Sequence, residues 1–377
     1  LKTALDQAKA VNTNSKATMP EVLEATWNLK QAISDYRMAN VSEDNPVDYT
    51  SHILNPSFET GNTDNWTVSG MATQNNSTFS SKKGTYYLEA WVNRGQQIGK
   101  ASASQVLKDL PDGNYKLSAY ALHVQQSSTS GTANTGAEQT GAWLYAGSQR
   151  TPVTAMKRYD VKFAVIDGES DVEIGLLAEG ATGNYLCVDN FTLAYTGALT
   201  ADSYVQDLSA LIDRADEYAN KGIQNSVRQQ LSDAIANARK TLESSSDNQE
   251  AINQARKALK TAIQEAKASI ARYAALQTRI DYANKVLEWW KDDKRKAAAT
   301  ASLQTAVSTA NSQMADYTLT DTQITQAVTT LNTKITAVDK KIYCSGSACG
   351  SDTQLKDPSN QWCYDRSIQS KHWILFW

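Results

Sequence analysis

The chain has 377 residues, of which 41% are hydrophobic and 20% charged, and its formal net charge is −3. This composition is typical of a folded chain, and the length indicates two to four domains at roughly 100–200 residues each. The nearly balanced charge excludes the basic surface expected of a nucleic-acid-binding protein. No run of about eighteen apolar residues predicts a membrane span.

Residues 1–45 begin with an amphipathic pattern. Its apolar residues follow the spacing of one helix face and are Leu1, Ala4, Leu5 and Ala8. A second pattern of the same kind starts 21 residues later, with Val22, Ala25, Leu29, Ala32 and Ile33. The segment therefore predicts two helices.

Between residues 46 and 198 the helical period disappears, and short segments of alternating hydrophobicity replace it. The expected strands are Gly84–Trp91, Tyr115–Val124, Ala142–Ala146, Tyr159–Val165, Val172–Leu176 and Tyr185–Tyr195. In the turn at 110–114, Pro111 fixes φ and Gly113 accepts a positive φ. Many short strands separated by turns predict a sandwich or a barrel.

Three motifs in this segment occur in the order found in a known family. They are Asn55–Gly61 followed by Trp66, then residues 105–117 around the turn, then Val188–Leu193. The segment resembles the galactose-binding-like β-sandwiches, which include many carbohydrate-binding modules. The resemblance covers about 150 residues and implies a jelly-roll-type sandwich with Trp66 in its core.

That resemblance also implies a structural calcium between the first and last strands, held by the matching acidic residues Glu59 and Asp189. Calcium accepts six to eight oxygen ligands in irregular geometry, so carbonyl groups could complete such a site. The alternative is that Glu59 caps a loop and Asp189 accepts hydrogen bonds from the backbone.

A sugar-binding site needs an exposed aromatic plane with polar groups around it. Strand alternation places Tyr87, Glu89 and Trp91 on one face. Trp91 precedes Arg94 at the edge of a loop, which makes it the first candidate for a stacking surface. The second candidate is the pair Trp143 and Tyr145, with the polar stretch 125–140 near it. The alternative for each aromatic residue is a place in the sandwich core.

The helical pattern returns at residues 199–342. The spacing of the first segment recurs in Leu231, Ala234, Ile235 and Ala238, and again in Leu303, Ala306, Val307 and Ala310. Each set is again followed by a second amphipathic pattern. Each is also preceded by a third one, and these two leading patterns start at Leu208 and Leu276. Three-helix bundles are therefore expected at 199–272 and 273–342, with residues 1–45 as a partial unit.

The repeats resemble the FIVAR domain, a three-helix module of bacterial surface proteins and glycan-degrading enzymes that acts mainly as a spacer. We therefore expect a multidomain α and β chain in which the sandwich is inserted between three-helix-bundle repeats. Trp289 and Trp290 are adjacent on a helix, so one is expected to pack and the other to be exposed.

The tail at 343–377 is expected to be the start of a further domain of the same polypeptide. It contains Cys344, Cys349 and Cys363, for which a disulfide would suit an oxidising compartment. The terminal strand pattern, 370–377, resembles faintly the start of metallopeptidase-like or other hydrolase-like modules. Cys187, alone in an apolar strand, is expected to be a buried hydrophobic residue.

No metal-ligand, nucleotide-binding or hydrolase motif is visible. The sequence favours a non-catalytic region of a secreted or bacterial cell-surface protein that binds carbohydrate, either a polysaccharide or a glycoprotein glycan. Two alternatives stay open. One is a structural or adhesive spacer with protein partners, and the other is the accessory region of a glycosidase or metallopeptidase-like hydrolase whose catalytic domain lies beyond residue 377.

Overall fold

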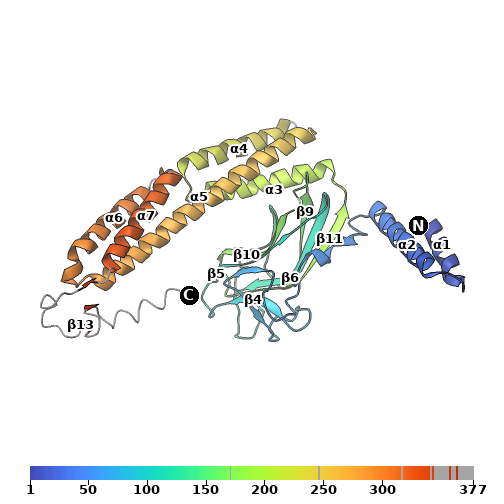
Figure 1. Ribbon diagram of the computed structural model, residues 1–377, viewed down its shortest axis with the longest axis horizontal. Coiled ribbons are helices and arrows are strands. Elements are labelled where there is room, and N and C mark those ends of the chain that lie inside the picture. The colour runs from blue at the N-terminus through green and yellow to red at the C-terminus, as the bar shows by residue number, and fades with distance from the viewer. Residues whose placement is uncertain are drawn as a thin grey trace. The chain divides into compact units, whose positions relative to one another are not determined.

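The computed structural model describes residues 1–169, 171–244, 247–315 and 317–339, together with the backbone of three short strands in the tail. Two compact units are present. The first consists of Leu1–Ile212 and Lys240–Arg256, and the second of Asp213–Arg239 and Lys257–Trp377. The expected class is confirmed, because a β-sandwich lies between helical segments of the chain (Figure 1).

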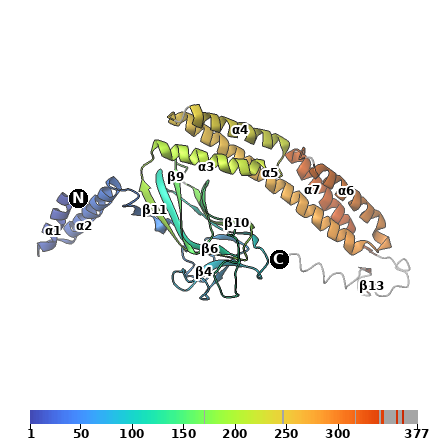
Figure 2. The same cartoon turned by 180° about the vertical axis from the view of Figure 1, so that it is seen from behind.

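The sandwich consists of two antiparallel sheets, visible from both sides in Figures 1 and 2. The β4 sheet contains, in order, β3 (Ala72–Gln74), β4 (Tyr87–Trp91), β11 (Tyr185–Gly197), β6 (Gly113–Val124) and β9 (Lys157–Val165), and β1 (Val47–Asp48) also pairs with β11. The β7 sheet contains β2 (Thr67–Ser69), β5 (Gly99–Leu107), β10 (Val172–Ala181), β7 (Ala142–Ala146) and β8 (Gln149–Pro152). A short 3₁₀ turn, Thr50–His52, follows β1.

Alternate residues of both sheets build the core between them. Trp66 belongs to it as expected, with 7% of its surface exposed, and it contacts Phe58 and Phe191. Its indole Nε1 donates hydrogen bonds to two backbone carbonyl groups, at 3.1 and 3.2 Å. A second, smaller cluster lies apart from this core and contains Phe79, Tyr87, Leu122, Val124, Tyr185 and Cys187. Cys187 is fully buried there, as expected.

The sequence pattern did not reveal β5 and β8 as whole strands. Four of the nine residues of β5 are Ala or Ser, so the strand lacks the β-branched and aromatic residues that mark strands in a sequence. Its inward Ala101 and Ala103 nevertheless alternate regularly with half-exposed Ser102 and Ser104. At the expected turn, Gly113 has a φ of +154°, and a Cβ there would lie 2.2 Å from the Tyr195 ring.

Helices α1 (Lys2–Thr13) and α2 (Met19–Ala39) form an antiparallel pair in which no residue is fully buried. Thr18 caps α2, because its backbone N donates to the Glu21 carboxylate at 2.7 Å within a capping box. The apolar side chains of Met19, Leu23 and Trp27 are 70%, 61% and 69% exposed.

Helices α3 (Ala201–Ala219), α4 (Asn225–Ser244) and α5 (Gln249–Trp290) follow the sandwich. The last helical pattern of the expected bundle at 199–272 and the leading pattern that starts at Leu276 lie on one continuous helix, α5, which has 42 residues. The reason is local: the residues between the two patterns include no Gly or Pro and are rich in Ala, so nothing ends the helix.

In the second unit, α5 shares a buried core with α6 (Ala297–Ala315) and α7 (Asp321–Asp339), and a 3₁₀ turn, Lys294–Lys296, precedes α6. Trp289 and Trp290 are both half-buried against this core, so the expectation that one of them would be exposed is wrong. The Trp290 Nε1 donates to Asp339 at 2.9 Å.

In the tail, β12 (Ile342–Tyr343), β14 (Trp362–Cys363) and β13 (Lys356–Asp357) pair as a small antiparallel sheet. The expected disulfide among the tail cysteines and the terminal strand at 370–377 lie outside the described residues. No helix in the described part of the chain is long and apolar enough to cross a membrane.

Candidate functional site

Trp91 is the last residue of β4 and lies on the face of the β4 sheet opposite the core. Leu88 and Ala90 on the same strand point into the core, so alternation directs Trp91 outward. Its side chain is 46% exposed, yet its indole Nε1 donates a hydrogen bond to the Gln126 Oε1 at 2.9 Å. The ring is therefore exposed but held in one orientation.

Gln126 and Asn184 form a buried amide pair beside Trp91, with exposed fractions of 3% and 0%. The Gln126 backbone N donates to the Asn184 Oδ1 at 2.7 Å, and the Asn184 Nδ2 donates to the Gln126 Oε1 at 3.1 Å. The sequence had placed Gln126 only within a polar stretch and had not singled out Asn184. The pattern gave no signal for either, because their partners are distant in sequence.

Arg94 lies in the loop after Trp91 and is tied to the same segment as Gln126. Its Nη1 donates to the Ser127 carbonyl oxygen at 3.1 Å. The structure thus brings the predicted residues Trp91 and Arg94 to one loop, Gln125–Thr140, whose two sides pair at Gln126 and Asn134. We call Trp91 and Arg94 the Trp91 platform.

Tyr87 and Glu89 share the outward face of β4, as predicted, but their roles differ from those of Trp91. Tyr87 is fully buried, so it has no surface for a sugar. Its hydroxyl contacts the Asn76 Oδ1 at 2.8 Å, the Glu89 Oε2 at 2.9 Å and the Tyr185 hydroxyl at 3.0 Å. Burial raises the pKa of Tyr87 well above its usual value, so it stays a neutral donor that fixes Glu89. The expectation that Tyr87 contacts a ligand is replaced by this supporting role.

Trp143 and Tyr145 lie on β7, in the other sheet, and the structure does not bring them together with Trp91. Both are half-buried. Arg150, directly opposite Tyr145 on β8, lies over the Trp143 ring with its guanidinium carbon 4.4 Å from the ring centre. The Tyr145 hydroxyl donates to the Glu173 carboxylate at 3.1 Å. Because a guanidinium covers one Trp143 face, this pair is a less open stacking surface than Trp91.

Glu59 and Asp189 bind neighbouring positions of one loop. The Glu59 carboxylate accepts hydrogen bonds from the backbone N of Thr85 and Tyr86, at 2.9 to 3.0 Å. The Asp189 Oδ2 accepts one from the backbone N of Lys83 at 2.5 Å. Both side chains therefore have the backbone-binding roles of the alternative interpretation.

Asp189 has a further feature that fits a cation. It is fully buried, and its second oxygen, Oδ1, has no hydrogen-bond partner. Burial, together with a smaller contribution from the nearby Glu59 charge, raises the pKa of Asp189 to about 7. Among the described residues no three His, Cys, Asp or Glu side chains cluster, so a calcium ion here would need carbonyl oxygens besides these two carboxylates. The orphaned oxygen and the pair of acidic residues fit that donor set.

Comparisons with known proteins agree with this division of the chain. Residues 1–36, 205–267 and 272–339 match the model of the FIVAR domain, so FIVAR regions flank the sandwich on both sides. No curated protein sequence matches the chain.

Several solved structures are similar to part of the chain. One is the enzymatically active domain of tailspike protein 4 of bacteriophage CBA120, with 16% identity and a TM-score of 0.28 over 38% of this chain and 21% of the tailspike chain. Another is the Stig cyclase Fisc from Fischerella sp. TAU, with 17% identity and a TM-score of 0.29 over 41% of this chain and 100% of the cyclase. A third is a family 16 carbohydrate-binding module, with 20% identity and a TM-score of 0.26 over 37% of this chain and 97% of the module. Enzymes and a binding module occur together in this set, so the likeness does not select a ligand or an activity for this chain.

Proposed function

We propose that residues 46–198 are a glycan-binding module whose stacking surface is Trp91. The observation that carries the proposal is an exposed indole, 46% accessible, whose nitrogen is bonded to a buried amide. An indole held in this way presents its apolar face to the C–H face of a sugar ring. The guanidinium of Arg94 beside it supplies donors for sugar hydroxyl groups.

In this proposal the module is non-catalytic, and the FIVAR regions separate it from further domains of a secreted or cell-surface protein. A catalytic hydrolase domain beyond residue 377 is compatible with that arrangement. Because the platform consists of one exposed indole and one guanidinium, its affinity for one short glycan should be modest, between about 1 mM and 1 μM. Several copies bound to a polymer would raise the overall affinity through avidity.

A printed oligosaccharide array probed with the full chain tests the proposal. We expect wild-type protein to bind one glycan class and Trp91→Ala to lose that binding. Trp143→Ala is the matched control, because it removes the same side chain from the other sheet and should keep the binding. Calorimetric melting of both variants checks that they fold. Silence of the wild type across the array would contradict the proposal.

A second candidate function is adhesion to a protein partner. The observation that favours it is the exposed apolar surface of α2, formed by Met19, Leu23 and Trp27. If the wild-type chain binds no glycan on the array, adhesion remains the candidate function, and the sandwich is then a rigid spacer.

We further propose that Glu59 and Asp189 hold a structural calcium ion. When bound, the ion would supply a positive charge that offsets the burial of the Asp189 carboxylate. Adding 1 mM CaCl₂, about a hundredfold above a Kd of roughly 10 μM, should stabilise the sandwich by about 2.7 kcal/mol and raise its melting temperature by several degrees. Asp189→Asn and Glu59→Gln should each remove this response, whereas Asp171→Asn, at an exposed surface ion pair, should keep it. A wild-type melting temperature that is equal in calcium and in chelator would contradict the proposal.

A further inference from the structure

The orientation of the Trp91 ring depends on groups that lie beneath it. An exposed tryptophan side chain ordinarily samples several rotamers, and binding a ligand then requires that freedom to be lost. At Trp91 a single side-chain hydrogen bond, from Nε1 to the Gln126 Oε1 at 2.9 Å, attaches the ring to the buried interior. The environment of Gln126 therefore decides whether the ring is fixed.

Both side-chain polar atoms of Gln126 and its backbone N form hydrogen bonds. Its Oε1 accepts from the indole and from the Asn184 Nδ2, and its Nε2 donates to the Gly131 carbonyl oxygen at 2.8 Å. Its backbone N donates to the Asn184 Oδ1. A buried amide whose oxygen and nitrogen are both hydrogen-bonded has one favoured orientation, because a flip would place donor against donor and acceptor against acceptor.

Asn184 connects this amide to three strand ends. Its Nδ2 also donates to the Val92 carbonyl oxygen at 2.9 Å, directly after β4. Its backbone N donates to the Val124 carbonyl at the end of β6, and its own carbonyl accepts from the Val92 backbone N. Asn184 itself immediately precedes β11. The amide pair is thus fixed to the sheet rather than to a loop alone.

We infer that Gln126 and Asn184 are positioning residues that hold the Trp91 indole in one orientation before any ligand binds. The consequence for binding rests on the proposed function. Ordering one rotamer-rich side chain on binding costs an amount equivalent to about three- to tenfold in affinity. Gln126 and Asn184 remove that cost, so losing them should weaken glycan binding by about this factor.

Gln126→Glu tests the inference through pH. At pH 8 the carboxylate has no proton to donate to the Gly131 carbonyl oxygen, and repulsion between the two oxygens should turn it out of the position in which it accepts from the indole. Burial raises the pKa of a carboxylic acid, so at pH 5 the acid form should restore the donor. We therefore expect Gln126→Glu to hold the Trp91 ring less firmly than wild type at pH 8 and as firmly as wild type at pH 5.

The first readout needs no glycan. It is hydrogen exchange of the Trp91 indole N–H in the ¹⁵N-labelled full chain, with the resonance identified by its loss in Trp91→Phe. Exchange in Gln126→Glu should be about tenfold faster than in wild type at pH 8 and close to wild type at pH 5. Gln97→Glu, the same change at a nearby exposed residue, should match wild type at both pH values. Equal exchange in Gln126→Glu and wild type at pH 8, or a defect that persists at pH 5, would overturn the inference.

The second readout is binding to the printed oligosaccharide array at both pH values. Gln126→Glu should bind about three- to tenfold more weakly than wild type at pH 8 and recover at pH 5. The double variant Trp91→Phe with Gln126→Glu should be no weaker than Trp91→Phe alone, because the bond is already absent. Additive losses would overturn the inference. Changed exchange without any array binding would support the positioning role and refute the proposed function.

Discussion

Replacing Arg256 with Ala should lower the free energy of unfolding of the first unit by about 3–5 kcal/mol. Arg256 is fully buried, and its guanidinium contacts the Asp207 carboxylate at 2.7 Å and the Glu169 carboxylate at 3.4 Å. Asp207 is itself 5% exposed. Truncating Arg256 would leave a buried carboxylate without its counter-charge, which costs far more than the loss of a surface ion pair.

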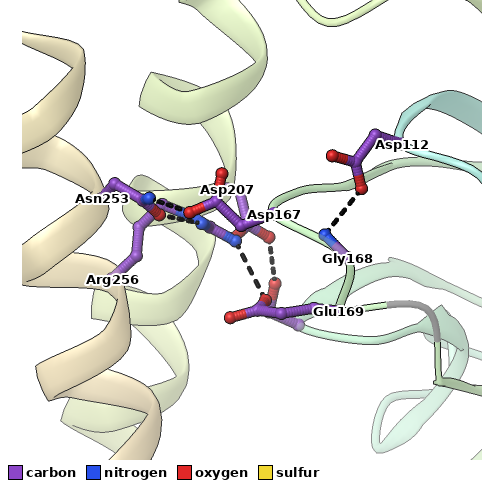
Figure 3. A network of polar contacts seen from close by, with 8 residues as sticks. Asp112, Asp167, Gly168, Glu169, Asp207, Asn253 and Arg256 are labelled. Atoms are coloured by element: carbon purple, nitrogen blue, oxygen red, sulfur yellow. Dashed lines mark hydrogen bonds and ion pairs between the residues drawn. The ribbon is translucent and has the colours of Figure 1, made fainter.

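The network around Arg256 joins parts of the first unit that are distant in sequence (Figure 3). Arg256 and Asn253 come from α5, Asp207 comes from α3, and residues 167–169 come from the loop between β9 and β10. The Arg256 Nη1 donates to the Asn253 Oδ1 at 2.7 Å, and the Asn253 Nδ2 donates to Asp167. The loss of Arg256 should therefore affect unfolding of the sandwich and not only of a helix.

Urea unfolding of the full chain, followed by circular dichroism and tryptophan fluorescence, measures this effect. Lys240→Ala removes an exposed cation from α4 and should change stability by less than about 0.5 kcal/mol. Arg256→Met combined with Asp207→Leu should be less harmful than Arg256→Met alone, because the buried Asp207 carboxylate is then no longer left without its counter-charge. A loss below about 1 kcal/mol in Arg256→Ala would contradict the assignment of a buried ion-pair network.

Acidification from pH 6.5 to pH 4 should cost the sandwich about 3 kcal/mol through His123 alone. His123 is 1% exposed, and its Nε2 accepts a hydrogen bond from the Gly183 backbone N at 3.1 Å, which requires the neutral ring. Burial lowers its pKa from 6.5 to about 4. The unfolded state therefore binds a proton that the folded state refuses, so stability is present above pH 6.5 and is lost as the pH falls toward 4.

The measurement is the free energy of unfolding against pH for wild type and His123→Gln. The Gln variant cannot titrate, so its curve should be flatter by about 3 kcal/mol across this window. Asp189 acts in the opposite direction, because its raised pKa of about 7 makes the folded state bind a proton more readily than the unfolded state. It is present in both proteins, so the difference between their curves isolates His123. Parallel curves would refute the assignment.

Much of the architecture could be predicted because it follows from periodicity. The FIVAR-like helices repeat with Ala and Leu on one face, and alternation along Tyr87–Trp91 correctly separates inward Leu88 and Ala90 from outward Trp91. The continuous α5 was not foreseen, since two hydrophobic stripes in phase look the same whether or not a turn separates them. β5 was missed as a strand because its small residues carry little strand signal.

The details of the candidate site depend on contacts that no local pattern encodes. The burial of Tyr87 follows from a loop that covers the outer face of the β4 sheet and brings Phe79 against it. The role of Asn184 depends on partners 58 and 92 residues away in the chain. The cover on the Trp143 ring comes from Arg150, which the hairpin register places beside it. The sequence could therefore name Trp91 and Arg94 as candidates but not their supports.

Isothermal titration calorimetry with the oligosaccharide that binds most strongly on the array tests the central claim most directly. The titration compares wild type, Trp91→Ala and Trp143→Ala as full chains of matched thermal stability. We predict that Trp91→Ala binds at least about tenfold more weakly than wild type, a change of ~1.4 kcal/mol, and that Trp143→Ala binds as wild type does. Unchanged affinity in Trp91→Ala, together with loss in Trp143→Ala, would contradict the account and move the binding surface to the β7 sheet.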